Sequence, residues 1–405
     1  MARKYPWGKL VSFTALLIAA SLLALACGSA APAPTPTTAA KPAAPAATTA
    51  PAAPAATTPA AGATAAATKP AAAAPAAPEK QISLKVSHQP EFESFPTWQA
   101  VQEGLDKKAA MELKMVYFDS GMPQVEALPA KQWEIGATGG VPMLMAALRY
   151  NAYMIGMTHD DGFNNMVMVR PNSPILKTKG FNPKYPDVIG HPDDVKGKTV
   201  LTTTVSSGHY ALSAWLKVLG LKDSDVKIQN LEQGQAVAAF DSGQGDIVSL
   251  WAPFSMTGLS KGWKMVSNGP QAGAVIPLVW ITSKEFADSN PDQVARFLKM
   301  YMAQIDRQKK ETVQQATQYQ KFLKDWCGID MNADMVKMDI ELHPMYDLKQ
   351  QLEIFDSSKG PSKAQGYMQG IADFFTENGR FKPEESEKAM KSNFITDKFL
   401  KMIAQ

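Results

Sequence analysis

Short apolar runs bounded by polar or turn residues recur along residues 83–283 and are typical of β-strands. Between them, apolar residues repeat at helical spacing, as in Leu212, Trp215 and Leu219. Alternating strands and helices predict an α/β fold with mostly parallel sheets, in which ligands bind outside the carboxyl ends of the strands. The predicted strands are residues 83–88, 113–118, 134–139, 198–203, 246–251 and 278–283.

Two segments, residues 123–142 and 234–253, share one order of features: a short helical stretch, a turn, an acidic residue, a strand and a proline. We interpret them as one unit in each of two similar lobes. From Asn290 onward helical patterns dominate, and this region is expected to pack on one lobe. Its first helix has an apolar face made of Val294, Phe297, Leu298, Tyr301 and Ile305.

The first 78 residues differ in composition from the rest. Arg3, Lys4 and Lys9 precede an uncharged apolar run that ends at Cys27, which is the layout of a bacterial signal peptide at residues 1–26. The run is shorter than the roughly 20 residues of a spanning helix, so a cleaved signal is favoured over an uncut anchor, and both stay open. The residues LALAC (23–27) resemble the lipobox of bacterial lipoproteins, which makes Cys27 the expected lipidation site.

Residues 27–78 consist almost only of Ala, Pro and Thr. Such a segment buries too little apolar surface to offset the entropy of ordering it, so it is predicted to be a disordered linker. It would tether the folded part to the extracytoplasmic face of a membrane, or leave it in the periplasm if the lipid is absent.

The formal net charge of +3 comes from the N-terminal segment. Removing the five basic residues before Glu79 from 41 leaves 36 Lys and Arg against 38 Asp and Glu. Nothing in this balance favours nucleic acid. If Cys27 carries a lipid, Cys327 has no cysteine partner, and we interpret it as a core thiol rather than a nucleophile.

A change from small polar to apolar residues marks the stretch TTTVSSGHYALSAWL (202–216). Residues 205–209 follow a predicted strand and open a predicted helix. The start of a helix has unpaired N–H groups that can bind an anion. The two serines can cap the helix or add hydroxyl donors. An ordinary N-cap with a solvated histidine is the alternative. Asp119, Ser120 and Gly121 stand at a similar strand-to-helix junction in the other lobe.

Residues 193–253 resemble the second lobe of the taurine, alkanesulfonate and nitrate-type substrate-binding proteins of ABC importers. The segments FDSG (118–121), EIGATGGVP (134–142) and 374–400 are also similar to that family. The resemblance implies a two-lobed type II periplasmic-binding-protein fold with two crossing strands, at 166–170 and just before 278–283. Lobe 1 is then expected to comprise residues 79–170 and 276–405, and lobe 2 residues 171–275.

The same resemblance implies a ligand clasped between the lobes and delivered to a membrane permease. A delivery protein on a stalk has no need for an oligomer, so a monomer is expected. By position the resemblance implies ligand contacts at Gln89, Phe92, Glu93, Thr138, Gly139, Ser206, Ser207, Gly208, His209 and Trp251. Phe254 is added as a pocket wall because aromatic side chains flank most small-molecule clefts. The expected ligand is a small organic anion or zwitterion of the taurine, sulfonate or nitrate type. Carboxylates that could neutralise a ligand ammonium, or simply be solvated, are Glu91, Glu93, Asp160 and Asp161.

The sequence gives little support for a metal site, a cofactor or catalysis. The five histidines form no HxxxH or HxxEH pattern, so no metal is expected, although His159 beside Asp160 and Asp161 is a weak hint of a cation site. No nucleophile motif or dinucleotide fingerprint occurs, and no cofactor or enzymatic activity is expected. A pyrimidine-precursor-related enzyme on the same fold and a ligand-binding sensor remain open as alternatives.

Overall fold

The computed structural model describes residues 80–405, apart from the side chains of residues 312 and 313. The expected signal peptide at 1–26, the lipidated Cys27 and the linker at 27–78 lie outside this range. Among the described residues, no helix combines the length and apolar character needed to cross a membrane.

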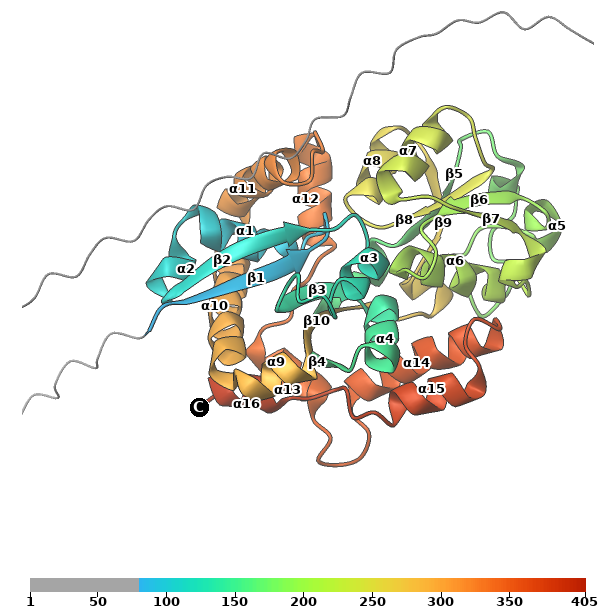
Figure 1. Ribbon diagram of the computed structural model, residues 1–405. Coiled ribbons are helices and arrows are strands. Elements are labelled where there is room, and N and C mark those ends of the chain that lie inside the picture. Colours follow the sequence, from blue (N-terminus) through green and yellow to red (C-terminus); the bar gives the residue numbers. More distant parts are fainter. Residues whose placement is uncertain (1–79) are drawn as a thin grey trace, which may run out of the picture. The chain divides into compact units, whose positions relative to one another are not determined.

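Two five-stranded sheets organise the described chain (Figure 1). The first has the order β2-β1-β3-β10-β4. Its first three strands are parallel, and β10 is antiparallel to both of its neighbours. The bounds are β1 (Ile82–His88), β2 (Met111–Tyr117), β3 (Ile135–Gly139), β4 (Ala152–Asp160) and β10 (Pro277–Ser283).

The second sheet repeats this plan with the order β7-β6-β8-β5-β9. Again three strands are parallel, and β5 is antiparallel to β8 and β9. The bounds are β5 (Met166–Val169), β6 (Thr199–Thr202), β7 (Lys227–Asn230), β8 (Ile247–Leu250) and β9 (Lys264–Asn268). The six predicted strands are therefore confirmed, and the two analogous segments become α3 with β3 and α7 with β8.

The chain crosses twice between the sheets. It passes from β4 to β5 through η1 (Asp161–Phe163) and returns from β9 to β10 through η4 (Pro270–Ala272). Asp160 ties the crossings together, because its Oδ1 accepts hydrogen bonds from the N–H of Gly162 and of Ile276, both at 2.9 Å. The expected lobe boundary after residue 170 would leave β5 in the first lobe, but β5 pairs with the second sheet, so the first crossing precedes Met166.

Helices cover both sheets. In the first lobe these are α1 (Ser94–Gln102), α2 (Leu105–Lys108), α3 (Gly121–Glu126) and α4 (Gly140–Arg149). The second lobe has η2 (Pro174–Lys177), α5 (Pro192–Val195), α6 (Ser207–Val218), η3 (Asp223–Asp225), α7 (Gln233–Asp241) and α8 (Phe254–Ser260). Trp98 of α1 and Trp215 of α6 are both buried.

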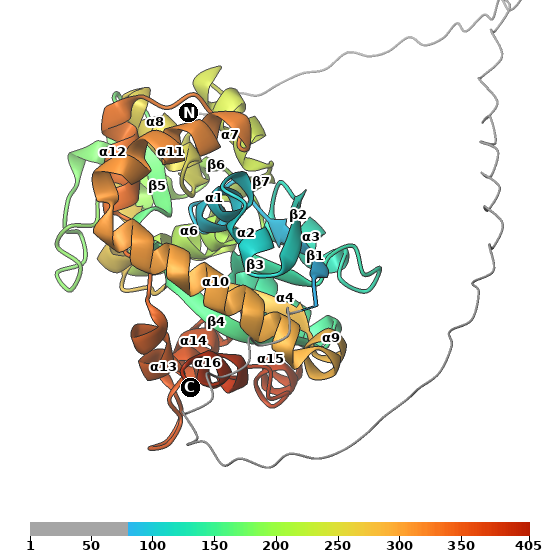
Figure 2. The same ribbon diagram turned by 90° about the vertical axis from the view of Figure 1, so that its left-hand side faces the viewer.

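The C-terminal region is helical, as predicted. It comprises α9 (Lys284–Ser289), α10 (Pro291–Lys310), α11 (Thr312–Asp325), α12 (Ala333–Glu341), α13 (Leu348–Phe355), α14 (Lys363–Glu377), α15 (Pro383–Met390) and α16 (Lys398–Ile403). The predicted apolar face of α10 is buried, and α10 packs against α1 and α16 (Figure 2).

This region does not pack on one lobe alone. α14 contacts α4 of the first lobe. It also reaches α6 of the second lobe, where the rings of Phe374 and Tyr210 lie 5.0 Å apart and Glu377 pairs with Lys217 at 2.6 Å. The helical periodicity located these elements, but it carries no information about which lobe each apolar face meets.

Candidate functional site between the lobes

The lobes meet at the carboxyl ends of their strands. Ser120, which precedes α3, donates a hydrogen bond to the Glu232 carboxylate at the start of α7, at 3.2 Å. Gly139, at the end of β3, faces Ser207 so closely that an added Cβ would lie 3.3 Å from the serine hydroxyl. The predicted contact residues Gly139 and Ser207 thus come together from opposite lobes.

In the first lobe, Gln89 and Thr138 are brought together as well. The Gln89 amide donates to the Thr138 hydroxyl at 3.0 Å and to the Gln124 side-chain oxygen at 2.8 Å. All three are buried. Gln124 was not among the expected residues, since nothing local marks a helical glutamine as part of a network spanning two strand ends.

The start of α6 is an N-cap built on Ser206, whose hydroxyl oxygen accepts the N–H of His209 at 3.2 Å. Ser206, Ser207, Gly208 and His209 are all buried. The helix start therefore lies against the first lobe rather than in open solvent, and of the four residues it is Ser207 that faces Gly139.

His209, an expected ligand contact, has no ring N–H free to donate to a ligand. Its Nδ1 accepts the N–H of Val205 at 3.1 Å, so the ring proton is on Nε2, which lies 2.8 Å from Asp223 Oδ2. Ser213 donates to the other oxygen of Asp223 at 2.6 Å. Both ring nitrogens are thus used within the second lobe, and the side chain holds the loop before α6.

Trp251 and Phe254 form the aromatic pair of the second lobe, with ring centroids 6.5 Å apart. Trp251 is buried, and its indole N–H has no hydrogen-bond partner in the described part of the chain. Phe254 is half-buried and lines a cleft of about 420 Å³ between the lobes. Tyr117 and Asp119 of the first lobe and the loop 327–330 after α11 line the same cleft.

The loop after β1 carries a group of buried polar side chains. His88, Glu91 and Glu93 each have at least one side-chain nitrogen or oxygen without a partner among residues 80–405. Burial lowers the pKa of His88 to about 3 and raises that of Glu93 to about 8. Burial and the neighbouring Glu93 raise the pKa of Glu91 well above its ordinary value.

Phe92 belongs to the same loop and is buried against the C-terminal region. Its ring stacks on His343, with centroids 4.7 Å apart and planes within 6°, and packs edge-on against Tyr319 at 4.8 Å. His343 follows α12, so the predicted ligand wall is instead a contact between the β1 loop and the C-terminal helices.

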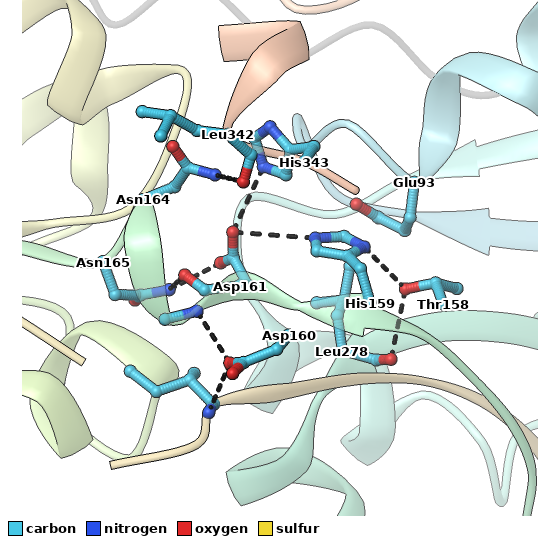
Figure 3. A network of polar contacts seen from close by, with 12 residues as sticks. Glu93, Thr158, His159, Asp160, Asp161, Asn164, Asn165, Leu278, Leu342 and His343 are labelled. Carbon is cyan, nitrogen blue, oxygen red and sulfur yellow. Dashed lines mark hydrogen bonds and ion pairs between the residues drawn. The ribbon is translucent and has the colours of Figure 1, made fainter. Parts of the chain in front are cut away.

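His343 also belongs to a buried network at the first crossing (Figure 3). Its Nε2 lies 3.2 Å from Asp161 Oδ1, and His159 Nε2 lies 3.6 Å from the same oxygen. Burial lowers the pKa of His159. Burial also lowers the pKa of His343, but Asp339 and Asp161 outweigh it and raise that pKa to about 10. Burial raises the pKa of Asp161, yet the two imidazoles bring it below its usual range.

The comparison with known families identifies the chain. Residues 86–322 match the family described as the periplasmic substrate-binding protein of the phosphonate ABC transporter. The chain belongs to this family of substrate-binding proteins. Its members bind substrates for ABC transporters rather than convert them.

Relatives in sequence agree with this assignment. A Brachyspira hyodysenteriae protein named as an ABC transporter periplasmic binding protein is 31% identical over 55% of this chain and 64% of its own length. The taurine-binding periplasmic protein of Escherichia coli K12 is 31% identical over 45% of this chain and 53% of its own. The chain therefore spans less than two thirds of these relatives.

Solved structures show the same fold. The alkanesulfonate-binding protein SsuA of Xanthomonas axonopodis pv. citri, bound to MOPS, has a TM-score of 0.62 at 17% identity and covers 78% of this chain and 99% of its own. The nitrate-binding protein NrtA of Synechocystis PCC 6803 has a TM-score of 0.61 at 12% identity, covering 80% and 88%. The resemblance to the taurine, alkanesulfonate and nitrate-type substrate-binding proteins is confirmed.

Proposed function

We propose that this substrate-binding protein captures a small organic anion or zwitterion between its lobes and delivers it to the permease of an ABC importer. It would do so as a monomer outside the cytoplasmic membrane, tethered by a lipid on Cys27 and the linker 27–78. The observation that carries the proposal is the pairing of two sheets of equal strand order, whose carboxyl ends meet at Ser120 with Glu232 and at Gly139 with Ser207.

The groups at this junction suit such a ligand. The start of α6 and the unpartnered indole N–H of Trp251 are donors for an anionic group. Glu91 and Glu93 in the opposing lobe are acceptors for an ammonium group, which favours a zwitterion. Gln89 and Thr138, two further expected contacts, form the buried network beside Gly139.

Lobe closure can be tested at Gly139. A larger side chain there would meet Ser207 and hold the lobes apart, whereas the backbone of Gly139, with φ −64° and ψ 156°, accepts any residue. We expect Gly139→Val to abolish the thermal stabilisation given by a panel of sulfonates, phosphonates and amino acids. A ligand at about 100 times its Kd stabilises the folded protein by about 2.7 kcal/mol, which is readily measured.

The matched control is Gly139→Ala combined with Ser207→Gly, which removes the opposing side chain. Ligand should raise the melting temperature of this double variant by more than that of Gly139→Ala alone. Equal ligand responses in the wild-type protein and Gly139→Val would rule out capture by closure at this junction.

A further inference from the structure

The network at the first crossing combines residues that are remote in sequence. His159 lies at the end of β4, Asp161 begins η1, and His343 follows α12, 182 residues from Asp161. All three are buried, and one ligand atom of each lies within 4.8 Å of the others. Figure 3 shows the Asp161 carboxylate between the two imidazoles, with the Glu93 side chain directed toward the same space.

The hydrogen bonds of His159 leave one nitrogen unexplained. Thr158 donates its only hydroxyl proton to the Leu278 carbonyl at 3.1 Å, so the contact of 3.0 Å between Thr158 Oγ1 and His159 Nδ1 requires the proton on Nδ1. In the neutral ring, Nε2 then presents a lone pair. This lone pair faces a carboxylate oxygen 3.6 Å away and has no hydrogen-bond partner among residues 80–405. Two electron-rich atoms so placed are stabilised by a cation between them.

The hydrogen bonds of His343 orient its ring in the same way. The carbonyl oxygen of Asp339 lies 2.6 Å from His343 Nδ1 and can only accept, so Nδ1 carries a proton, and Nε2, whose own proton a bound metal ion would displace, is directed at Asp161. Metal-bound histidines commonly donate the other ring N–H to a carbonyl or hydroxyl oxygen in this manner, which fixes the tautomer and the ring orientation.

The distances from the two imidazole nitrogens to the shared carboxylate oxygen are close to those of a metal centre. Two ligand atoms bound to one ion at about 2.0–2.1 Å in tetrahedral geometry lie about 3.3–3.4 Å apart. The two imidazole nitrogens lie 3.6 and 3.2 Å from Asp161 Oδ1. We propose that His159, Asp161 and His343 form a binding site for one divalent transition-metal ion of the zinc class. Two imidazoles and one carboxylate are a ligand set that such ions favour over Mg²⁺ or Ca²⁺.

The surroundings of the site complete the argument. Asn165 donates to Asp161 Oδ2 at 2.5 Å, which leaves Oδ1 for the ion. Glu91 and Glu93 add unpartnered carboxyl oxygens nearby, and their Coulombic effect on one another is the kind that a cation relieves. A purely structural network accounts for the bond between His343 and Asp161, but not for the bare nitrogen of His159. The metal site has Glu91 and Glu93 in common with the proposed solute site, but the three ligands are other residues and the inference does not depend on the proposed function.

Zinc binding by the purified protein, free of any polyhistidine tag and stripped with a chelator, tests the proposal. Titration against a chromophoric zinc chelator should give one ion per chain with a Kd of micromolar or below. X-ray absorption of the zinc-loaded wild-type protein should show imidazole nitrogen and carboxylate oxygen at about 2.0–2.1 Å. A sulfur shell at about 2.3 Å would place the ion at a cysteine and overturn the assignment.

Variants of the site and a remote histidine provide the second measurement. His159→Gln should weaken zinc binding more than about 100-fold, because the loss of an outer-shell partner alone costs about 10–100-fold. Thr158→Val removes only the outer-shell partner of His159. It should therefore weaken zinc binding by about 10–100-fold. His191→Gln, at a partly exposed histidine of the second lobe, is the matched control and should bind zinc as the wild-type does. Absence of zinc binding, or equal affinity in His159→Gln and His191→Gln, would refute the site, while solute responses report separately on the proposed function.

Discussion

β1 and β6 hold equivalent positions in the two sheets, yet the loops that follow them are built differently. Each strand is parallel to both of its neighbours and leads into a helix at its carboxyl end. After β6, residues 203–209, which include the first three residues of α6, pair the side chains of Thr203, Ser206 and His209 within the second lobe. After β1, the loop 88–93 buries polar groups that find no partner in the described chain.

The second-lobe loop is a closed set of hydrogen bonds. Thr203 donates to Leu231 O at 2.8 Å, Ser206 donates to Thr203 O at 2.6 Å, and His209 connects Val205 to Asp223. Val205 has a φ of 56°, which is unusual for a β-branched residue and is retained here by these contacts. This loop is therefore a rigid wall of the junction.

The polar side chains of the first-lobe loop are not paired in this way. His88 has no partner for either ring nitrogen within residues 80–405, and Glu91 and Glu93 each keep one free carboxyl oxygen. Buried polar groups without partners cost about 1–3 kcal/mol each. The difference shows that the side chains of Ser206 and His209 at the helix start serve the scaffold, which leaves the backbone N–H groups there for a ligand, while the unpartnered side chains lie in the loop after β1.

The largest expected effect on stability follows from removing His209. His209→Ala leaves the buried Asp223 without its 2.8 Å partner and frees the N–H of Val205. We expect a loss of about 3 kcal/mol in the free energy of unfolding, measured by urea denaturation at pH 7.5. A loss below about 1 kcal/mol would contradict the scaffold role and return His209 to the ligand site.

The corresponding substitution in the first lobe, at His88, should have little effect on the free energy of unfolding. His88→Leu replaces an unpartnered buried imidazole by an apolar side chain and is expected to cost less than about 1 kcal/mol at pH 7.5, because it removes no hydrogen bond. The ring also contacts Trp280 edge-on at 5.6 Å, a packing interaction that leucine partly keeps.

The same variant has a distinct pH dependence. The folded-state pKa of His88, about 3, lies below the unfolded value of about 6.5, so the neutral ring favours folding and protonation favours unfolding. The contribution of His88 to the free energy of unfolding is complete above pH 6.5 and is lost as the pH falls toward 3. The wild-type protein should thus lose about 2 kcal/mol more than His88→Leu between pH 7.5 and 5. Parallel stability curves for the two proteins would show that His88 is not held neutral.

The fold was largely predictable from sequence because the strands that carry it are continuous apolar runs. The strands β4, β7 and β9 were not predicted. β7 is largely exposed and polar, and an edge strand of this kind lacks the apolar run on which prediction relies. The assignment of β5 to the second sheet depends on hydrogen bonds to β8 and β9, which no local pattern encodes.

The site was predictable only in part. Gly139 and Ser207 do meet, and Gln89 does join Thr138. The network of His159, Asp161 and His343 was not predictable, since histidine motifs describe neighbours on one element and His343 comes from the C-terminal helical region. In the sequence, only the pair formed by His159 and Asp161 indicated a cation site. A pair of this kind is common by chance.

The smallest expected effect concerns the hydrogen bond that joins the two lobes. Ser120 and Glu232 lie at the edge of the interlobe cleft, where burial raises the pKa of Glu232. A double-mutant cycle with Ser120→Ala and Glu232→Gln should give a coupling energy of about 0.5 kcal/mol or less in urea denaturation, because a partly exposed bond competes with water. The same cycle applied to ligand affinity should show a larger coupling, since only the closed arrangement contains this contact. Equal coupling in both measurements would mean that the bond is formed to the same extent with and without ligand, and that it does not report on closure of the lobes.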